Sequence, residues 1–113
     1  SLSENELMFI SLVIIPLNLL GSAETEALSI KIFSEGVSKF PSDVRMLRHR
    51  GHRFITTRQF DNALEDYLKA YSLMKDQEDE IEPDGLPNAM NIPLTTTHGN
   101  IRYHLGLTYY LKH

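Results

Sequence analysis

The sequence contains no cysteine, and this absence excludes several kinds of chemistry. Disulfides, thiolate zinc sites and thiol nucleophiles all require Cys, so these 113 residues cannot form them. Basic residues are also few, since 11 Lys and Arg stand against 15 Asp and Glu, giving a net charge of −4. Proteins that bind nucleic acid mainly through its phosphates are usually basic, so nucleic acid is not an expected partner. The length allows one hydrophobic core, and we expect a single domain over residues 1–113.

Long apolar runs are absent as well, and the longest candidate is Leu7–Leu20, which Pro16 and two polar residues interrupt. A membrane-spanning helix needs about 20 apolar residues, so no membrane span is expected. Small residues at Gly21–Ala23 fit a signal-peptide cleavage site, but the acidic flank Ser3–Glu6 lacks the basic residues of an export signal. We interpret Leu7–Leu20 as a buried structural helix. The cytoplasm is the first expectation for location, and an exported or periplasmic location follows if residues 7–23 are a targeting segment.

Hydrophobic spacing predicts an all-α fold. Apolar residues recur at steps of three and four in several segments, and the strict alternation typical of strands is never sustained. The predicted helices cover Thr25–Phe40, Asp43–Thr57, Asp61–Lys75 and Asn100 to the end of the chain. Asp61 is the expected N-cap of the third helix. The short link at residues 58–60 places the second and third helices side by side as an antiparallel hairpin.

Small and large residues are interspersed along this hairpin, which lets two helices approach closely. The residues concerned are Leu47, Gly51, Phe54, Phe60, Ala63, Tyr67 and Ala70. In spacing and residue class the segment resembles the tetratricopeptide repeat (TPR), a helix–turn–helix unit of about 34 residues. Phe33, Gly36 and Pro41 are similar to the end of a preceding repeat, and Tyr103–Tyr110 is similar to the first helix of a further one. Arg50 departs from the family pattern, which usually has Leu there.

The resemblance implies antiparallel helical hairpins stacked as a short TPR-like array, a right-handed superhelix. Residues 7–40 would form a degenerate first repeat, 43–75 the clear repeat, and 100–113 the first helix of a truncated last repeat. Residues 76–98 are then an inserted loop, acidic at its start and rich in proline. Three prolines in this insert forbid a continuous helix.

The truncated last repeat predicts self-association. Without a following helix, four apolar residues of the last segment lack a cover, namely Ile101, Leu105, Tyr109 and Leu111. The apolar Leu7–Leu20 segment needs burial too, and the first and last helices of a linear array lie apart. We therefore expect a homo-oligomer with one of these surfaces at the contact.

No motif for catalysis or cofactor binding is present. The sequence has no GxSxG elbow, no phosphate-binding glycine loop and no HExxH, so we expect neither an enzyme nor a cofactor. His49 and His52 have a spacing that can hold a metal, but no third ligand is nearby in sequence, and we interpret them as two solvated histidines. The run 76–84 lacks the glycine and the closing glutamate of a calcium loop and is interpreted as a solvated charge run.

The resemblance also implies a binding surface, because the first helix of each TPR lines the concave face of the array. Two sets of four residues correspond to this face: Arg45, Arg48, His52 and Ile55, and then Asn100, Tyr103, Leu107 and Tyr110. The expected function is a non-enzymatic scaffold that binds a protein or peptide on the concave face. Some relatives clamp a peptide's terminal carboxylate, but His104 stands where that clamp has Asn.

Charge distribution bears on the partner. Arginines gather on the helix Asp43–Thr57, while the run 76–84 is acidic. The basic helix favours an acidic peptide as partner, and the alternative is that the basic helix and the acidic run neutralise each other or are separately solvated. The alternative function is an accessory or regulatory domain of a larger, exported enzyme or envelope assembly.

Overall fold

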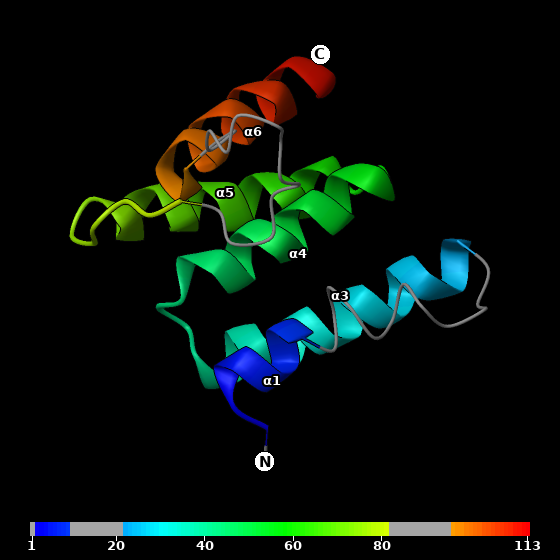
Figure 1. Cartoon of the computed structure of the whole chain (residues 1–113). Helices are drawn as coiled ribbons and strands as arrows, with labels where there is room; N and C mark the ends of the chain where they lie inside the picture. The colour runs from blue at the N-terminus through cyan, green and yellow to red at the C-terminus, as the bar shows by residue number, and fades with distance from the viewer. Residues whose placement is uncertain (1, 10–21, 82–95) are drawn as a thin grey trace, which may run out of the picture.

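The computed structural model describes residues 2–9, 22–81 and 96–113, and within them the fold is all-α as predicted. Its helices are α1 (Glu4–Phe9), α3 (Ser22–Lys39), α4 (Val44–Thr56), α5 (Phe60–Met74) and α6 (Thr97–Leu111), shown in Figure 1. The only extended pairing among the described residues is one isolated antiparallel bridge between Ile81 and Thr96. None of the helices in this part of the chain combines the length and the apolar character needed to cross a bilayer.

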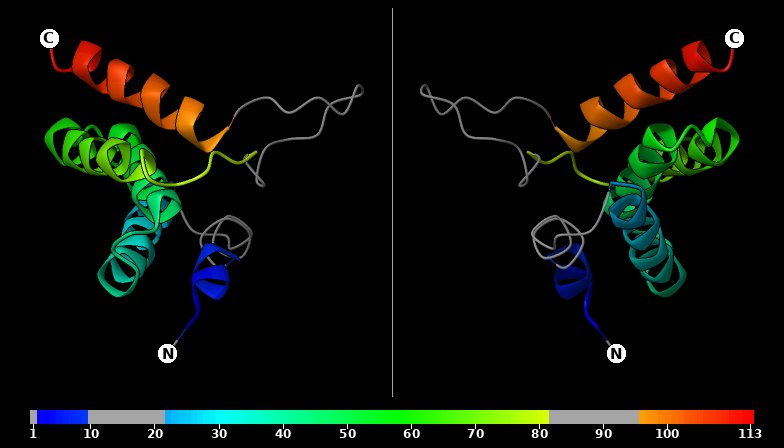
Figure 2. Two further views of the ribbon diagram at one scale, coloured as in Figure 1. Left: turned by 90° about the vertical axis from the view of Figure 1, so that its left-hand side faces the viewer. Right: turned by 90° about the vertical axis from the view of Figure 1, so that its right-hand side faces the viewer.

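Helices that follow one another in sequence pack against one another. α3 packs on α4, α4 on α5 and α5 on α6, and α4 also touches α6 across the hairpin. Figure 1 and the two turned views of Figure 2 place the α4–α5 hairpin in the middle, with α6 on one side and α3 on the other. α1 lies against α3. In the part of the chain that the structure describes, α4 thus has the largest number of helical neighbours, and it lies between α3 and α6.

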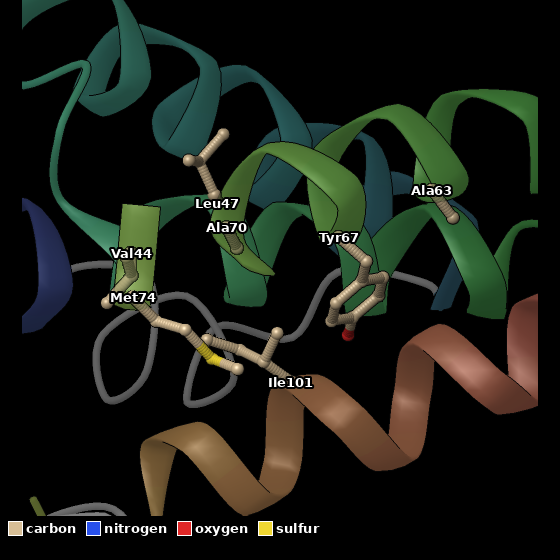
Figure 3. Packing of buried hydrophobic residues seen from close by; sticks show 7 residues of the cluster. All are labelled: Val44, Leu47, Ala63, Tyr67, Ala70, Met74 and Ile101. Carbon is tan, nitrogen blue, oxygen red and sulfur yellow. The ribbon is translucent and has the colours of Figure 1, made fainter. Parts of the chain in front are cut away.

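The larger core cluster joins α4, α5 and α6 (Figure 3). Its buried members are Val44, Leu47, Ala63, Tyr67, Ala70, Met74 and Ile101. Ile101 is fully buried, and Leu105, which is half-buried, packs against the cluster. The expectation that these two residues lack a cover was therefore wrong, because α5 and α4 supply it. Tyr109 and Leu111 remain 45% and 37% exposed.

A second cluster joins α1, α3 and α4. Leu7 and Met8 are buried together with Phe33 of α3 and Met46 of α4. In the described part of the predicted Leu7–Leu20 helix, Leu7 and Met8 are thus buried, and the segment is helical as far as Phe9, where α1 ends. Residues 10–20 of that segment lie outside the described residues.

Two glycines allow close helix contacts, as predicted for Gly51. A Cβ at Gly51 would lie 2.7 Å from Cε2 of Tyr67, so only a residue without a side chain permits this approach of α5 to α4. At Gly36 a Cβ would lie 2.7 Å from Sδ of Met46, a more flexible side chain than the Tyr67 ring. Gly106 differs, since it is exposed and a Cβ there would meet no described atom within 4 Å.

The ends of α4 are set by local hydrogen bonds. Asp43 is its N-cap, and Oδ1 accepts from the N–H groups of Arg45 and Met46 at 2.9 and 3.4 Å. At the other end Arg58 has φ 61°, its N–H donates to Ile55 O, and the N–H of Gln59 donates to Phe54 O. These two bonds form a Schellman motif, with Arg58 in the left-handed position that glycine usually takes.

Several predicted helix boundaries differ from the structure, and α3, for example, begins at Ser22 rather than Thr25. Asp61 is not the N-cap of α5, because the helix begins at Phe60 after Gln59, and Asp61 lies inside its first turn. α6 begins at Thr97 with Thr96 as N-cap, so residues 97–98 of the predicted insert are helical. The N–H of Thr97 donates to Glu80 O at 2.8 Å and closes the base of the inserted loop. The three prolines of the insert lie outside the described residues.

Candidate functional site

The contact between α4 and α6 is made by aromatic and histidine rings. The ring centroids of His52 and His104 lie 5.3 Å apart with an interplanar angle of 74°. His104 also stacks on Tyr67 of α5 at 5.7 Å and meets Tyr103 edge to face at 5.0 Å. We call His52, Tyr67, Tyr103 and His104 the ring cluster. The ring cluster contains residues of α4, α5 and α6 and packs α6 against the α4–α5 hairpin.

The pKa values of both histidines of the ring cluster are lowered, which favours the neutral imidazole. Burial lowers the pKa of His52 to about 4, and the charges of Arg53 and Arg48 and the neighbouring His104 act in the same direction. Burial also lowers the pKa of His104, with a further contribution from Arg48, although the contact of its Nδ1 with Asn100 O at 3.0 Å opposes this shift. A neutral imidazole packs as an aromatic ring, which suits the stacking on Tyr67.

The arginines of α4 are largely engaged within the fold. Arg50 donates to both carboxylate oxygens of Asp66 on α5, at 2.8 and 2.6 Å, and Arg53 pairs with Glu26 of α3 at 3.0 Å. Burial raises the pKa of Asp66, and the Arg50 guanidinium acts against that shift. A bidentate Arg–carboxylate pair is geometrically specific, so it orients α5 on α4 as well as neutralising the charge.

The acidic run does not supply the carboxylates that pair with Arg45, Arg50 and Arg53. Asp76, Glu78 and Glu80 are exposed, and Asp79 accepts hydrogen bonds through Oδ1 from the N–H groups of Glu80 and His98, both at 2.9 Å. Among the described residues Arg45 thus pairs with Asp43, Arg50 with Asp66 and Arg53 with Glu26, so these three arginines are not neutralised by residues 76–80.

The first predicted set of groove residues, on α4, is only partly accessible. Arg48 is 6% exposed, with Nη2 3.1 Å from Nε2 of His49, so it does not project into a groove. His52 is half-buried in the ring cluster, and Ile55 is half-buried against the core. Arg45 is half-buried, with Nη2 3.5 Å from Oδ2 of Asp43. The positive charge that α4 presents to solvent is smaller than the sequence suggests.

The second set, on α6, is more accessible. Tyr103 is 66% exposed and Tyr110 is 76% exposed, while Asn100 and Leu107 are half-buried. Positions 100, 103, 107 and 110 follow helical spacing, so these residues share one side of α6. The His52–His104 contact brings this side next to α4.

Sequence reasoning missed the role of His104. It was noted only as a departure from a carboxylate clamp, yet it contacts His52, Tyr67 and Tyr103. Its position one turn from both Asn100 and Leu107 was a usable signal, because a residue there lies beside the predicted groove stripe.

Neither a metal centre nor a catalytic constellation is assembled from His49 and His52. His49 stacks on Phe33 of α3, with centroids 5.3 Å apart, whereas His52 faces His104 of α6. The interpretation of both as solvated was wrong, since His49 is 4% exposed and His52 is half-buried. In residues 2–9, 22–81 and 96–113, no group of three His, Asp or Glu side chains is placed to hold a metal ion.

The geometry is that of a packed helical surface with two prominent tyrosines, and similarity to known proteins adds no further assignment. Comparison with protein-family models, with curated proteins and with solved structures finds no match to this chain.

Proposed function

We propose that the chain is a non-enzymatic interaction module of TPR type that binds a partner protein or peptide on the face formed by α4 and α6. The observation that carries the proposal is the exposure of Tyr103 and Tyr110, 66% and 76%, on one side of α6. Tyrosine is enriched at interaction hot spots because its ring buries a large area and its hydroxyl still hydrogen-bonds. Two exposed tyrosine rings on the same side of one helix therefore offer a surface on which a partner can bind.

Support for the TPR interpretation comes from the way the helices approach one another. Gly36 and Gly51 each receive a large side chain from the following helix, Met46 and Tyr67 respectively. α4 touches α6 as well as α5, as expected where the first helices of consecutive hairpins lie side by side. Arg50, the departure from the family pattern, is matched by Asp66 on the facing helix.

The partner is proposed to be acidic. Residues 97–113 contain no Asp or Glu, and Arg102 lies exposed one position before Tyr103. Because Arg48 is buried and His52 is neutral, we assign the attraction to Arg102 and Arg45 rather than to the centre of α4. Such surface attraction is screened over about 8 Å at physiological ionic strength, so binding should weaken as salt rises.

A peptide array of acidic and basic sequences, followed by titration of the best binders, tests this proposal. Tyr103→Ala combined with Tyr110→Ala should weaken binding at least about tenfold, the effect typical of a hot-spot loss. Leu68→Ala is the matched control, since Leu68 is 42% exposed on α5 outside the proposed face. Arg102→Glu should reverse the preference for acidic peptides. Equal recovery of acidic and basic peptides, or unchanged binding by the double variant, would refute the proposal.

We also propose that the chain forms a homo-oligomer, although fewer apolar residues of α6 are available for the contact than the sequence predicted. Ile101 and Leu105 pack within the chain, so the remaining candidates on α6 are Tyr109 and Leu111. Sedimentation of the 13.0 kDa chain over a range of concentrations distinguishes the states. A concentration-dependent dimer that Tyr109→Glu dissociates would support self-association, and a monomer at all concentrations would reject it.

A further inference from the structure

The two histidines of the ring cluster lie on different helices and join them. His52 of α4 and His104 of α6 have ring centroids 5.3 Å apart, and His104 stacks on Tyr67 of α5 with an interplanar angle of 11°. Both imidazoles are half-buried. A proton gained by either ring would therefore place a positive charge at the point where α4, α5 and α6 meet.

Among the described residues, the charged side chains that act on these two imidazoles are basic. Besides burial, the charges of Arg53 and Arg48 lower the pKa of His52. Burial and Arg48 also lower the pKa of His104. Glu26 of α3 pairs with Arg53 at 3.0 Å rather than with either histidine. The other packed helices present uncharged groups to the rings: Tyr67 of α5, and Tyr103 and the Asn100 carbonyl of α6. No described carboxylate is thus placed to stabilise a protonated imidazole in this contact.

A proton binds these imidazoles more tightly when α6 is separated from the hairpin. Burial is the main cause of the low pKa of both rings, and it brings the pKa of His52 to about 4. Separation of α6 hydrates both rings, so their pKa values return towards the ordinary 6.5. The separated form then takes up protons that the docked form does not, and acid favours separation.

We propose that the contact between His52 and His104 is an acid-sensitive joint, and that protonation of the two rings releases α6 while the α4–α5 hairpin stays folded. The release needs no partner, so it does not rest on the proposed function. One consequence does rest on it. Tyr103 and Tyr110 leave with α6 whereas Arg45 stays on α4, so acid divides the proposed binding face.

The hairpin has contacts of its own that do not involve the two histidines. Arg50 donates to both carboxylate oxygens of Asp66, and the Tyr67 ring packs on Gly51. Burial raises the pKa of Asp66, so the folded hairpin binds a proton at least as well as the unfolded chain and acid does not weaken it through this carboxylate.

Two carboxylates at helix starts set the lower limit of the useful pH range. Asp43 caps α4, and Asp79 accepts from the N–H of His98 in the first turn of α6. The pKa values of both carboxylates are lowered from 3.8, so both stay charged at pH 5. A comparison of pH 7 with pH 5 therefore changes the histidines and leaves these two helix starts as they are.

Hydrogen exchange of the whole chain, followed by NMR at pH 7 and at pH 5, tests the proposal. Protection factors are corrected for the intrinsic effect of pH on exchange and are compared between α6 and the α4–α5 hairpin. A return of the His52 pKa from about 4 to 6.5 favours the released form about twentyfold more at pH 5 than at pH 7. Protection in the middle of α6 should therefore fall about twentyfold or more relative to the hairpin. An equal fall in α6 and the hairpin, or no fall in α6, overturns the proposal.

Variants without a titratable ring separate this joint from a general effect of acid. His52→Phe keeps a ring against His104 but takes up no proton, so it should reduce the fall in α6 protection. His52→Phe combined with His104→Phe should abolish the fall. His98→Gln is the matched control, because His98 is also on α6 but lies 4.0 Å from the Asp79 carboxylate, outside the ring cluster, and this variant should behave as the wild type does.

The quantity compared for each variant is the ratio of its α6 protection at the two pH values. A variant whose α6 docks less tightly at both pH values therefore still gives a decisive result. A fall of wild-type size in His52→Phe or in the double variant overturns the proposal, and so does loss of the fall in His98→Gln.

Discussion

Gly51→Ala tests the close contact between α4 and Tyr67 of α5, and Gly106→Ala is its matched control. A Cβ at position 51 would lie 2.7 Å from Cε2 and 3.0 Å from Cδ2 of Tyr67. The ring has little room to move, because Tyr67 is fully buried and its hydroxyl donates to Arg48 O at 3.2 Å. At position 106, by contrast, a Cβ would meet no described atom within 4 Å.

The two substitutions share one energetic contribution and differ in another. Each gains about 1 kcal/mol of helix propensity when Ala replaces Gly. This gain cancels in the comparison, so the difference between the variants isolates the overpacking cost at Tyr67, about 1–3 kcal/mol. We expect Gly106→Ala to raise the free energy of unfolding by about 1 kcal/mol and Gly51→Ala to lower it by ~0–2 kcal/mol.

Urea unfolding followed by circular dichroism measures both free energies. In the Gly51→Ala background, Tyr67→Leu should cost less than it does in the wild type, because the smaller side chain relieves the contact. If Gly51→Ala stabilised the chain as much as Gly106→Ala does, the reasoning about close packing would be refuted.

Two further predictions concern the end of α4 and the ring cluster. Arg58 has φ 61°, so Arg58→Gly should raise the free energy of unfolding by about 0.5–1 kcal/mol, whereas Arg102→Gly within α6 should lower it by about 1 kcal/mol. Folding lowers the pKa of His52 from 6.5 to about 4. Between these two pH values the unfolded state binds more protons than the folded state, so the free energy of unfolding decreases as the pH is lowered from 6.5 to about 4. His52→Gln should flatten that part of the curve of melting temperature against pH, and an unchanged slope would contradict the argument.

Helix existence and the contact at Gly51 could be read from the sequence because both depend on local spacing. The start of α5 could not, because Asp is favourable both as an N-cap and inside the first turn. What decides the boundary is the left-handed conformation of Arg58, which turns the chain so that the helix begins at Phe60. Composition gave no sign of this turn, since glycine rather than arginine is usual there.

The accessibility of the predicted groove residues depended on contacts between helices. Spacing placed Arg48 and Tyr103 at corresponding positions, yet the first is 6% exposed and the second 66% exposed. The partner of Arg50 is equally invisible to periodicity, because Asp66 lies on another helix. The two glycines give another example. A Cβ at Gly51 would meet the Tyr67 ring, whereas a Cβ at Gly106 would meet no described atom within 4 Å.

The sequential packing of the helices has a consequence for how the chain folds. Only residues 57–59 join α4 to α5, whereas residues 75–96 join α5 to α6. Closing the longer loop costs more chain entropy, by about 0.6 kcal/mol for each doubling of its length. The α4–α5 hairpin should therefore form first and α6 should dock afterwards as a separate cooperative unit. Amide hydrogens of α6 should accordingly exchange with solvent sooner than those of α4, and each opening of α6 would uncover His52 and Tyr67 together.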